Sequence, residues 1–237
     1  MPDPIPTPRA AVVMLAAGEG RRVGHDTNKV LLPLAGRPVL TWTVGRVTAL
    51  SGIGPVVLVI RDGDQDAVRE AMASPAAGTD DVIVVTGGAS RHASEWHALC
   101  ALRPAIERGE IDVVVIHDAA RPLASAEVFH DVIESAMRHG GALPVVDQPA
   151  LIRMHPGGGP VTERTVAVQT PQAFRAEPLL NAYVDADRDG FVGTDTASCI
   201  ERYTDLPVHC VAGDARNIKI TFPEDLALAE RLLATSG

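Results

Sequence analysis

The feature that most constrains the fold is a series of continuously apolar segments that alternate with amphipathic ones. Segments such as "VVLVI", "VIVVT" and "DVVVIHD" carry apolar residues at successive positions rather than at every second position. Continuous apolar strands are typical of sheets that helices cover on both faces. We expect strands near residues 11–16, 55–60, 82–86, 112–117, 143–146 and 207–211.

Amphipathic stretches of helical length fill most of the intervals between these strands. They span residues 39–50, 65–73, 90–106, 126–139, 177–186 and 223–234. The alternation predicts an α/β fold with a doubly wound, mostly parallel, Rossmann-like sheet. Ligands of such sheets bind at the carboxyl ends of the strands. The loops "AAGEGRR", "GGASR" and "HDAARP" all begin where an expected strand ends, so we expect them to form one site.

The chain shows no internal repeat and no low-complexity linker between domains. We therefore expect residues 11–237 to form a single domain, after a disordered, proline-rich lead-in at residues 1–10. Residues 147–168 break the rhythm, because two short apolar pieces flank "HPGGGP". Glycines between prolines favour a hairpin tip or a projecting β-arm. Such an arm buries little by itself, so we expect it to join two copies of the chain as a homodimer.

Composition excludes several classes of partner. A net charge of −9 argues against a nucleic-acid partner, because a nucleic-acid backbone is bound by Lys and Arg that displace counterions. No apolar run approaches the roughly 18 residues of a membrane span, and the N-terminus does not resemble a secretory signal. The three cysteines, Cys100, Cys199 and Cys210, are far apart and outside any CxxC spacing. They indicate reduced thiols in a cytoplasmic protein.

The first strand-end loop combines bare backbone with cations. Its small residues are Ala16, Ala17, Gly18 and Gly20, and its cations are Arg21, Arg22 and Lys29. Backbone N–H groups without bulky side chains let a phosphate or a base edge approach closely, and the cations suit a polyphosphate. Neither the GxGxxG nor the Walker pattern is present. Nucleotide binding is the functional hypothesis, and a tight turn with solvated basic residues is the alternative.

The second loop, "GGASRHAS", contributes Gly87, Gly88, Arg91 and Ser94. Bare glycines and a hydroxyl suit the edge of a pyrimidine base, which backbone and short polar groups can read. The same residues also fit a glycine turn followed by a helix that Ser90 caps. The two interpretations are compatible.

Taken together, the motifs resemble those of a known family. "AAGEGRR", Lys29 and "LLPLAGRPVL" are similar to the opening of the nucleotidyltransferases with a GT-A-like fold. "GGASRHAS", "HDAARP", "QTPQAF" and "NIKITFPEDLALAE" narrow the resemblance to the 2-C-methyl-D-erythritol 4-phosphate cytidylyltransferases of non-mevalonate isoprenoid biosynthesis. The resemblance covers nearly the whole chain. It implies Mg²⁺-dependent transfer of CMP from CTP to methylerythritol phosphate, with release of pyrophosphate.

The resemblance also implies roles for individual cations. Arg22 and Lys29 would stabilise charge at the α-phosphate, and Lys219 would be the third catalytic cation. Lys219 lies in "NIKIT", which we expect to be a strand with Ile218 and Ile220 turned toward the core and Lys219 toward the site.

Further roles concern the acceptor and the metal. Arg121 and Thr170 correspond to family positions that hold the acceptor. Asp118, at a strand end, would bind Mg²⁺ or orient the acceptor; the alternative is that it caps the following helix. His117 lies in an apolar strand, so we expect it to be a hydrogen-bonded core histidine rather than a catalytic base.

The sequence departs from the family in the arm. The family has "DTIK" where this chain has "DQPA", so Gln148 replaces a threonine that contacts the acceptor and Ala150 replaces a lysine. Arg164 is the candidate for the family's arm arginine, which reaches the acceptor site of the partner subunit. The nucleotide half of the pattern is thus intact, whereas the acceptor half is altered.

Two alternatives follow. The acceptor could be another polyol or sugar phosphate, such as ribitol 5-phosphate, although "HDAARP" favours methylerythritol phosphate. The chain could instead be a non-catalytic nucleotide-binding paralogue. Retention of Arg22, Lys29, Asp118 and Lys219 argues against that, because a retired site has no physical need for four charges in one cleft.

Overall fold

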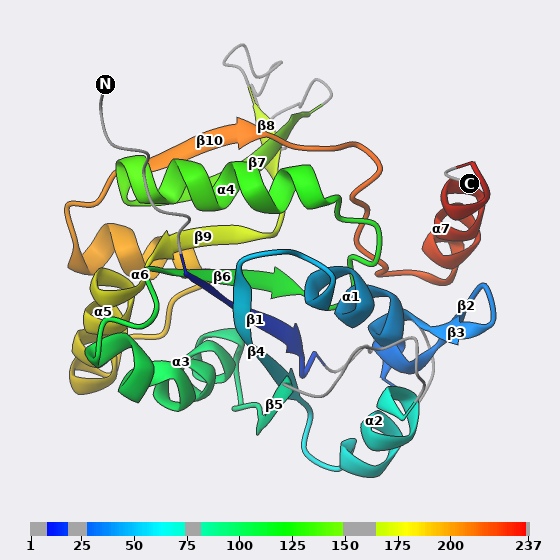
Figure 1. Cartoon of the computed structure of the whole chain (residues 1–237), viewed down its shortest axis with the longest axis horizontal. Coiled ribbons are helices and arrows are strands. Elements are labelled where there is room, and N and C mark those ends of the chain that lie inside the picture. The colour runs from blue at the N-terminus through cyan, green and yellow to red at the C-terminus, as the bar shows by residue number, and fades with distance from the viewer. Residues whose placement is uncertain (1–8, 19–27, 74–81, 149–164, 236–237) are drawn as a thin grey trace, which may run out of the picture.

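The computed structural model describes residues 9–18, 28–73, 82–148 and 165–235. The strands of the main sheet are β1 (Ala10–Ala16), β4 (Ile53–Ile60), β5 (Val82–Thr86), β6 (Val113–Asp118), β7 (Gly141–Asp147), β8 (Val166–Val168), β9 (Gln172–Arg175) and β10 (Val208–Ala212). Within the described residues these eight strands run in the order β10-β7-β9-β6-β1-β4-β5, with β8 paired to β7 (Figure 1).

Most of the sheet is parallel, as the continuous apolar runs predict. β1 pairs in parallel with both β4 and β6, β4 with β5, and β10 with β7. β9 is inserted antiparallel between β6 and β7. The β1–β6 register sets Leu15 opposite Asp118, so the chain leaves β1 directly beside the end of β6. This register brings two of the predicted site loops together.

Helices cover both faces of the sheet. α1 (Val39–Thr48), α2 (Gln65–Met72) and α4 (Ala126–His139) pack on one face, and α3 (Arg91–Glu107), α5 (Ala176–Asp189) and α6 (Thr196–Tyr203) on the other (Figure 1). Residues of β1 alternate between the two cores: Val12 and Met14 face the first group, and Ala11 and Val13 face the second. Alternation along a strand that is buried on both sides explains its continuous hydrophobicity.

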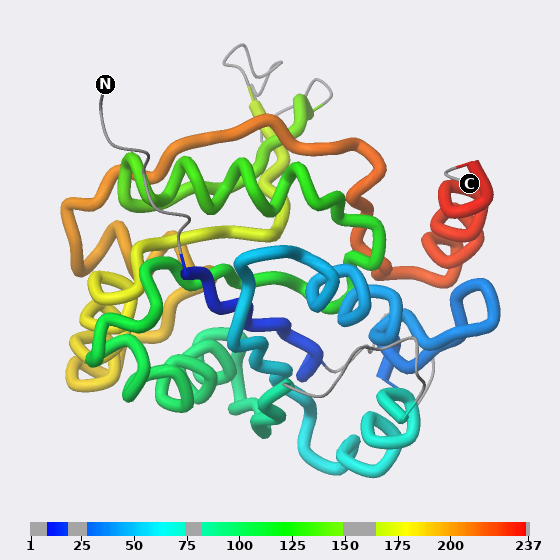
Figure 2. Tube along the Cα trace, in the orientation of Figure 1, coloured from blue at the N-terminus to red at the C-terminus, as the bar shows by residue number. Residues whose placement is uncertain are grey.

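A third, smaller core lies between a short hairpin that precedes α1 and the C-terminal helix. The short hairpin of β2 (Pro33–Leu34) and β3 (Arg37–Pro38) lies beside α7 (Pro223–Ala234), as Figure 2 shows. Leu34, Ile220 and Ala229 are buried in this core. This packing fixes the position of the segment that carries Lys219, which directly precedes α7.

The structure corrects several expectations. Residues 217–221 form no strand, because they pair with no neighbouring strand. The N–H of Ile220 donates to the Ala120 carbonyl at 2.8 Å, whereas the N–H groups of Asn217 and Ile218 donate to the nearby carbonyls of Asp214 and Arg216. The sidedness survives: Ile220 is buried and Lys219 is exposed on the other side. The expected lead-in was two residues too long, since Ala10 begins β1 and Arg9 pairs with Asp112. Elements α6, β2, β3 and β9 were not predicted.

The antiparallel pair of β7 and β8 forms the base of the expected arm (Figure 1). Its centre, residues 149–164, lies outside the described residues. None of the helices in the described ranges is both long and apolar enough to cross a membrane.

Candidate active site

A cavity of about 580 Å³ opens where β1, β4, β5 and β6 end. This is the position that the strand-end rule for open α/β sheets predicts. Ten of the predicted site residues line it: Ala16, Ala17, Gly18, Lys29, Gly87, Gly88, Arg91, Ser94, Asp118 and Lys219. The three loops singled out in the sequence therefore contribute to one site.

The loop after β5 requires glycine because it packs tightly against the loop after β1. A Cβ atom on Gly87 would lie 2.6 Å from the Cβ of Ala17 and 2.9 Å from Oγ of Ser94. The N–H of Gly88 donates to Ser94 Oγ at 3.1 Å, and Ser90 caps α3 by accepting from the N–H of Ala93. The loop is thus a capped helix start that also presents bare backbone to the cavity, and its reading of a pyrimidine edge stays a prediction.

Asn28 is a site residue that sequence reasoning missed. Its buried amide donates to the Ala16 carbonyl at 2.7 Å and to Asp64 Oδ2 at 2.9 Å, and its side-chain oxygen accepts from the N–H of Val30. These bonds tie the end of β1 to the short 3₁₀ helix Lys29–Leu31. Asn28 therefore fixes where Lys29 enters the cavity. The sequence feature that could have indicated this role is the position of Asn28 directly before a helical turn, where Asn is a preferred N-cap residue.

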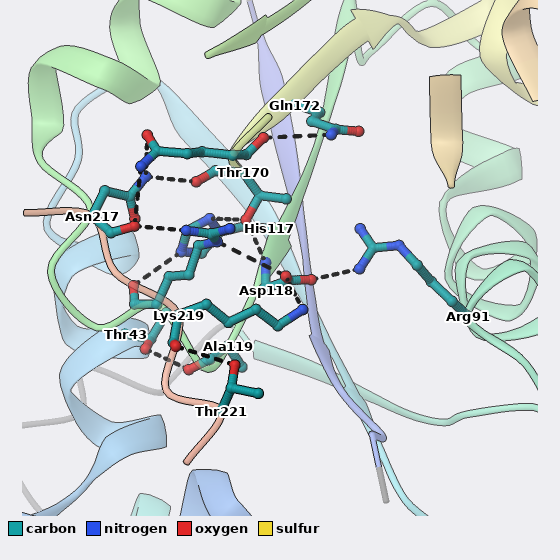
Figure 3. A network of polar contacts seen from close by, with 12 residues as sticks. Thr43, Arg91, His117, Asp118, Ala119, Thr170, Gln172, Asn217, Lys219 and Thr221 are labelled. Atoms are coloured by element: carbon teal, nitrogen blue, oxygen red, sulfur yellow. Dashed lines mark hydrogen bonds and ion pairs between the residues drawn. The ribbon is translucent and has the colours of Figure 1, made fainter. Parts of the chain in front are cut away.

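Asp118 is the centre of charge in the site (Figure 3). Its Oδ1 lies 2.5 Å from Nη1 of Arg91, and its Oδ2 lies 2.7 Å from Nζ of Lys219 and 3.9 Å from Nε of Arg121. Burial alone would raise the pKa of Asp118, but the charges of Arg91 and Lys219 outweigh burial and hold that pKa well below its usual range. Asp118 is thus an ionised carboxylate that organises three cations. It does not cap the following helix, because Ser125 caps α4.

Thr170 and Arg121 lie behind Asp118 rather than on the cavity wall. The Thr170 hydroxyl accepts the backbone N–H of Asp118 at 3.0 Å. Arg121 donates from Nη1 to the Asn217 carbonyl at 2.6 Å, and the Asn217 amide donates to the Thr170 carbonyl at 2.9 Å. These contacts connect the ends of β6 and β8 to the segment that carries Lys219 (Figure 3).

His117 is a core histidine with a defined tautomer, as expected from its apolar strand. Its Nε2 lies 3.3 Å from the carbonyl of Arg121, which can only accept, so Nε2 carries the proton. Nδ1 then accepts the hydroxyl of Thr170 at 3.2 Å. Burial lowers the pKa of His117 to about 4, so the ring is neutral at pH 7. His117, Thr170 and the Asp118 N–H thus form a hydrogen-bond chain with one direction.

The remaining predicted site residues divide into two groups. Gln148 is exposed just beyond β7 and does not line the cavity. Gly20, Arg21, Arg22 and Arg164 lie outside the described residues.

The lysine content provides a further signal that sequence reasoning missed. The chain has 21 Lys and Arg residues, of which only Lys29 and Lys219 are lysine. Both line the cavity. Ion pairs elsewhere in the described residues are made by arginine, as in Arg69–Asp66 and Arg108–Glu110.

A cavity lined by bare backbone and by cations, at the strand ends of a doubly wound sheet, is typical of a nucleotide-handling transferase. Comparison with known proteins identifies the family. The model of the 2-C-methyl-D-erythritol 4-phosphate cytidylyltransferase family matches residues 10–235, and the chain belongs to this family.

Individual relatives agree with this assignment. The chain is 40% identical over 232 residues to 2-C-methyl-D-erythritol 4-phosphate cytidylyltransferase of Symbiobacterium thermophilum, covering 94% of this chain and 92% of the relative. It is 37% identical over 240 residues to the protein of the same name from Solibacter usitatus, covering 95% and 96%. A solved structure, 4-diphosphocytidyl-2C-methyl-D-erythritol synthase of Anaerococcus prevotii, superposes with a TM-score of 0.81 at 26% identity, covering 96% and 97%.

The described residues do not fit a resident magnesium site. The carboxylates that line the cavity are Asp62 and Asp118, and both oxygens of Asp118 are paired with cations. No group of three or more His, Cys, Asp or Glu residues gathers to hold a metal within the described ranges. Mg²⁺ is commonly held by one or two carboxylates together with substrate phosphates. A metal at this site would therefore arrive as part of a nucleotide substrate, and a direct contact with Asp118 stays a prediction.

Proposed function

We propose that this protein transfers CMP from the magnesium complex of CTP to 2-C-methyl-D-erythritol 4-phosphate. A phosphate oxygen of the acceptor attacks the α-phosphorus of CTP, the new P–O bond forms, and the bond to the bridging oxygen breaks as pyrophosphate leaves with the electron pair. The observation that carries the proposal is the cavity that Lys29, Lys219 and the Arg91–Asp118 pair line together with a bare glycine loop. Family membership supports the choice of substrates.

The residues divide the work between binding and charge stabilisation. The backbone of Gly87 and Gly88 and the hydroxyl of Ser94 suit the cytosine edge. The backbone of residues 16–18 suits the triphosphate, together with Arg21 and Arg22 of the following loop. Phosphoryl transfer needs positioned positive charge more than covalent help from the protein. Lys29 and Lys219 are proposed to supply that charge on the transferring phosphoryl group.

For the acceptor we propose contacts from two sources. Asp118 and its cations, with Arg121 and Thr170 behind them, form the wall next to the α-phosphate position. The arm, with Gln148 at its base and Arg164 further along, would complete the acceptor site from a second copy of the chain. The exposed Val166 and Val168 of β8 support a role for the arm in homodimer contacts. Measurement of molar mass in solution tests this, and a monomer at micromolar concentration would contradict it.

A cytoplasmic location is proposed as well. Cys100, Cys199 and Cys210 are free thiols, and Cys100 and Cys210 are exposed. Exposed free thiols suit a reducing compartment.

Pyrophosphate release tests the activity directly. The purified chain is incubated with Mg²⁺, CTP and either methylerythritol phosphate, ribitol 5-phosphate or no acceptor, and ATP replaces CTP as the control for the base. We expect release only with CTP and methylerythritol phosphate. A higher kcat/KM with ribitol 5-phosphate would move the chain to the alternative substrate. No release with any acceptor, despite CTP binding, would support the non-catalytic alternative.

The altered arm allows a second test of the acceptor. Gln148→Thr together with Ala150→Lys restores the residues of the family pattern. If Gln148 and Ala150 weaken acceptor binding, the double substitution raises kcat/KM for methylerythritol phosphate and leaves the KM for CTP unchanged. Equal kcat/KM values before and after would indicate that these two arm positions do not select the acceptor.

A further inference from the structure

A buried carboxylate lies behind the cavity wall, one helical turn from Arg91. Glu95 is 1% exposed and does not line the cavity. Its Oε1 lies 2.9 Å from Nε of Arg91 and accepts the hydroxyl of Thr196 at 3.0 Å, and its Oε2 accepts the hydroxyl of Tyr183. The two hydroxyls donate hydrogen bonds to the carboxylate, and Arg91 places a positive charge beside it. These surroundings suit the ionised form, which only accepts hydrogen bonds.

Arg91 thus connects two carboxylates on opposite sides of its guanidinium group. Nε faces Glu95, and Nη1 lies 2.5 Å from Oδ1 of Asp118. The spacing of four residues on α3 places Glu95 beside Arg91, and the planar guanidinium couples the position of Nε to the direction of Nη1. The Nε–H is not in hydrogen-bond geometry with Glu95, so the attraction is one of charge.

A purely structural role would not require a charge at this position. Glu95 is surrounded by the apolar core that α3, α5 and α6 form against the sheet, in which Leu99, Tyr183 and Cys199 are buried. Burial raises the pKa of Glu95, although Arg91 opposes this. Buried ion pairs can often be replaced by apolar side chains without loss of stability. The carboxylate therefore points to a requirement of Arg91 rather than of the core.

We propose that Glu95 is a positioning residue for the cytidylyl transfer: it holds Arg91 on Asp118 and keeps this guanidinium from moving onto the incoming triphosphate. The inference rests on the proposed function. Without the charge of Glu95, the triphosphate would compete with Asp118 for Arg91. Binding of CTP in the ground state would be preserved or strengthened, whereas the arrangement of Asp118 and Lys219 needed in the transition state would be lost. The expected signature is a fall in kcat without a rise in the KM for CTP.

The chain provides a matched control on the same helix. Arg103 and Glu107 of α3 have the same spacing, with Nε 3.2 Å from Oε1, but lie at the other end of the helix. We expect Glu95→Gln to lower kcat about tenfold with an unchanged or lower KM for CTP, and Glu107→Gln to change neither. An unchanged kcat in Glu95→Gln, or a loss expressed only as a higher KM, would overturn the proposal.

A double-mutant cycle separates action through Arg91 from a general effect on folding. In Arg91→Lys the planar guanidinium that connects the two carboxylates is absent. Adding Glu95→Gln to this variant should therefore lower kcat by less than a further factor of about two. The same loss in both backgrounds would show that Glu95 does not act through Arg91. If Glu95→Gln fails to fold, Thr196→Val is the alternative variant, because it removes one hydrogen-bond donor to the carboxylate. It should lower kcat by a smaller factor, again without a rise in the KM for CTP. An unchanged kcat in Thr196→Val would then overturn the proposal.

A measurement without turnover distinguishes failure of this inference from failure of the proposed function. The Nε–H signal of Arg91 in ¹⁵N NMR, assigned by its loss in Arg91→Lys, should shift and exchange faster with water in Glu95→Gln but not in Glu107→Gln. An unaltered signal overturns the contact whether or not the chain releases pyrophosphate. A shifted signal in a chain that releases no pyrophosphate would support the contact between Glu95 and Arg91 and contradict only the proposed function.

Discussion

Protonation of His117 is expected to destabilise the fold as the pH falls. The pKa of His117 is lowered from 6.5 to about 4 by complete burial. Between these values the unfolded chain binds a proton that the folded chain does not, so the free energy of unfolding decreases with decreasing pH. The contribution is fully present above pH 6.5. From a folded pKa of about 4, the loss is about 2 kcal/mol at pH 5 and about 3 kcal/mol at pH 4.

Urea unfolding at pH 7 and pH 5, for the native chain and for His117→Gln, isolates this contribution. Gln does not titrate, and its amide can still donate to the Arg121 carbonyl that Nε2 of His117 contacts. Other groups that titrate in this range, such as His92, are present in both proteins and cancel. We expect the native chain to lose about 2 kcal/mol more than the variant between the two pH values.

Two results would refute this reasoning. Parallel stability curves for the native chain and His117→Gln would show that His117 does not titrate differently in the folded state. A proton NMR titration of the native chain in which the His117 ring signal changes near pH 6.5 would show that the ring is accessible to protonation. The directed hydrogen-bond chain through Thr170 to Asp118 would then also be wrong, because Nδ1 could not remain an acceptor.

The remaining predictions concern the cavity. Arg22→Ala, Lys29→Ala and Lys219→Ala should each lower kcat by about 10²–10³-fold in the pyrophosphate assay, with unchanged circular dichroism; near-native turnover would exclude the residue concerned from charge stabilisation. Asp118→Asn should lower kcat about 10²-fold, because Arg91 and Lys219 lose their shared anion, and a loss that does not grow at limiting Mg²⁺ would rule out a metal contact. Gly87→Ala should destabilise the fold by about 1–3 kcal/mol in urea, because its Cβ would overlap Ala17, and unchanged stability would contradict the packing of the two loops.

Much of the architecture could be predicted because it depends on local patterns. Continuous apolar runs indicated strands buried on both faces. The six strands and six helices expected from the alternation are present, most with slightly shifted ends, whereas the strand expected at "NIKIT" is absent. The strand-end rule then placed the first, second and third loops at one cavity. Neither step needs information about which distant residues meet.

The parts that were missed depend on contacts between distant segments. Glu95 is defined by Tyr183 and Thr196, which are 88 and 101 residues away in the chain. Strand β9 has only four residues, too few for a pattern, and it is defined by antiparallel pairing with β6 and β7, which lie earlier in the chain. Residues 217–221 have a strand-like pattern but no neighbouring strand, so their alternation predicted sidedness correctly and secondary structure wrongly.

The positions of the two lysines indicate what kind of positive charge the cavity requires. Arginine supplies nearly all of its positive charge, including the ion pairs of α2 and α5. A guanidinium is a planar fork that suits a fixed carboxylate, whereas an ammonium is a compact point charge on a flexible stem. Arg91, Arg121 and Lys219 all lie against Asp118. Of the three, Lys219 has a flexible side chain with a compact ammonium group, so it can move to a phosphate oxygen, whereas the donors of a guanidinium are fixed in one plane. Because both lysines line the cavity, we infer that the site needs mobile charge, which arginine at the same positions would not supply.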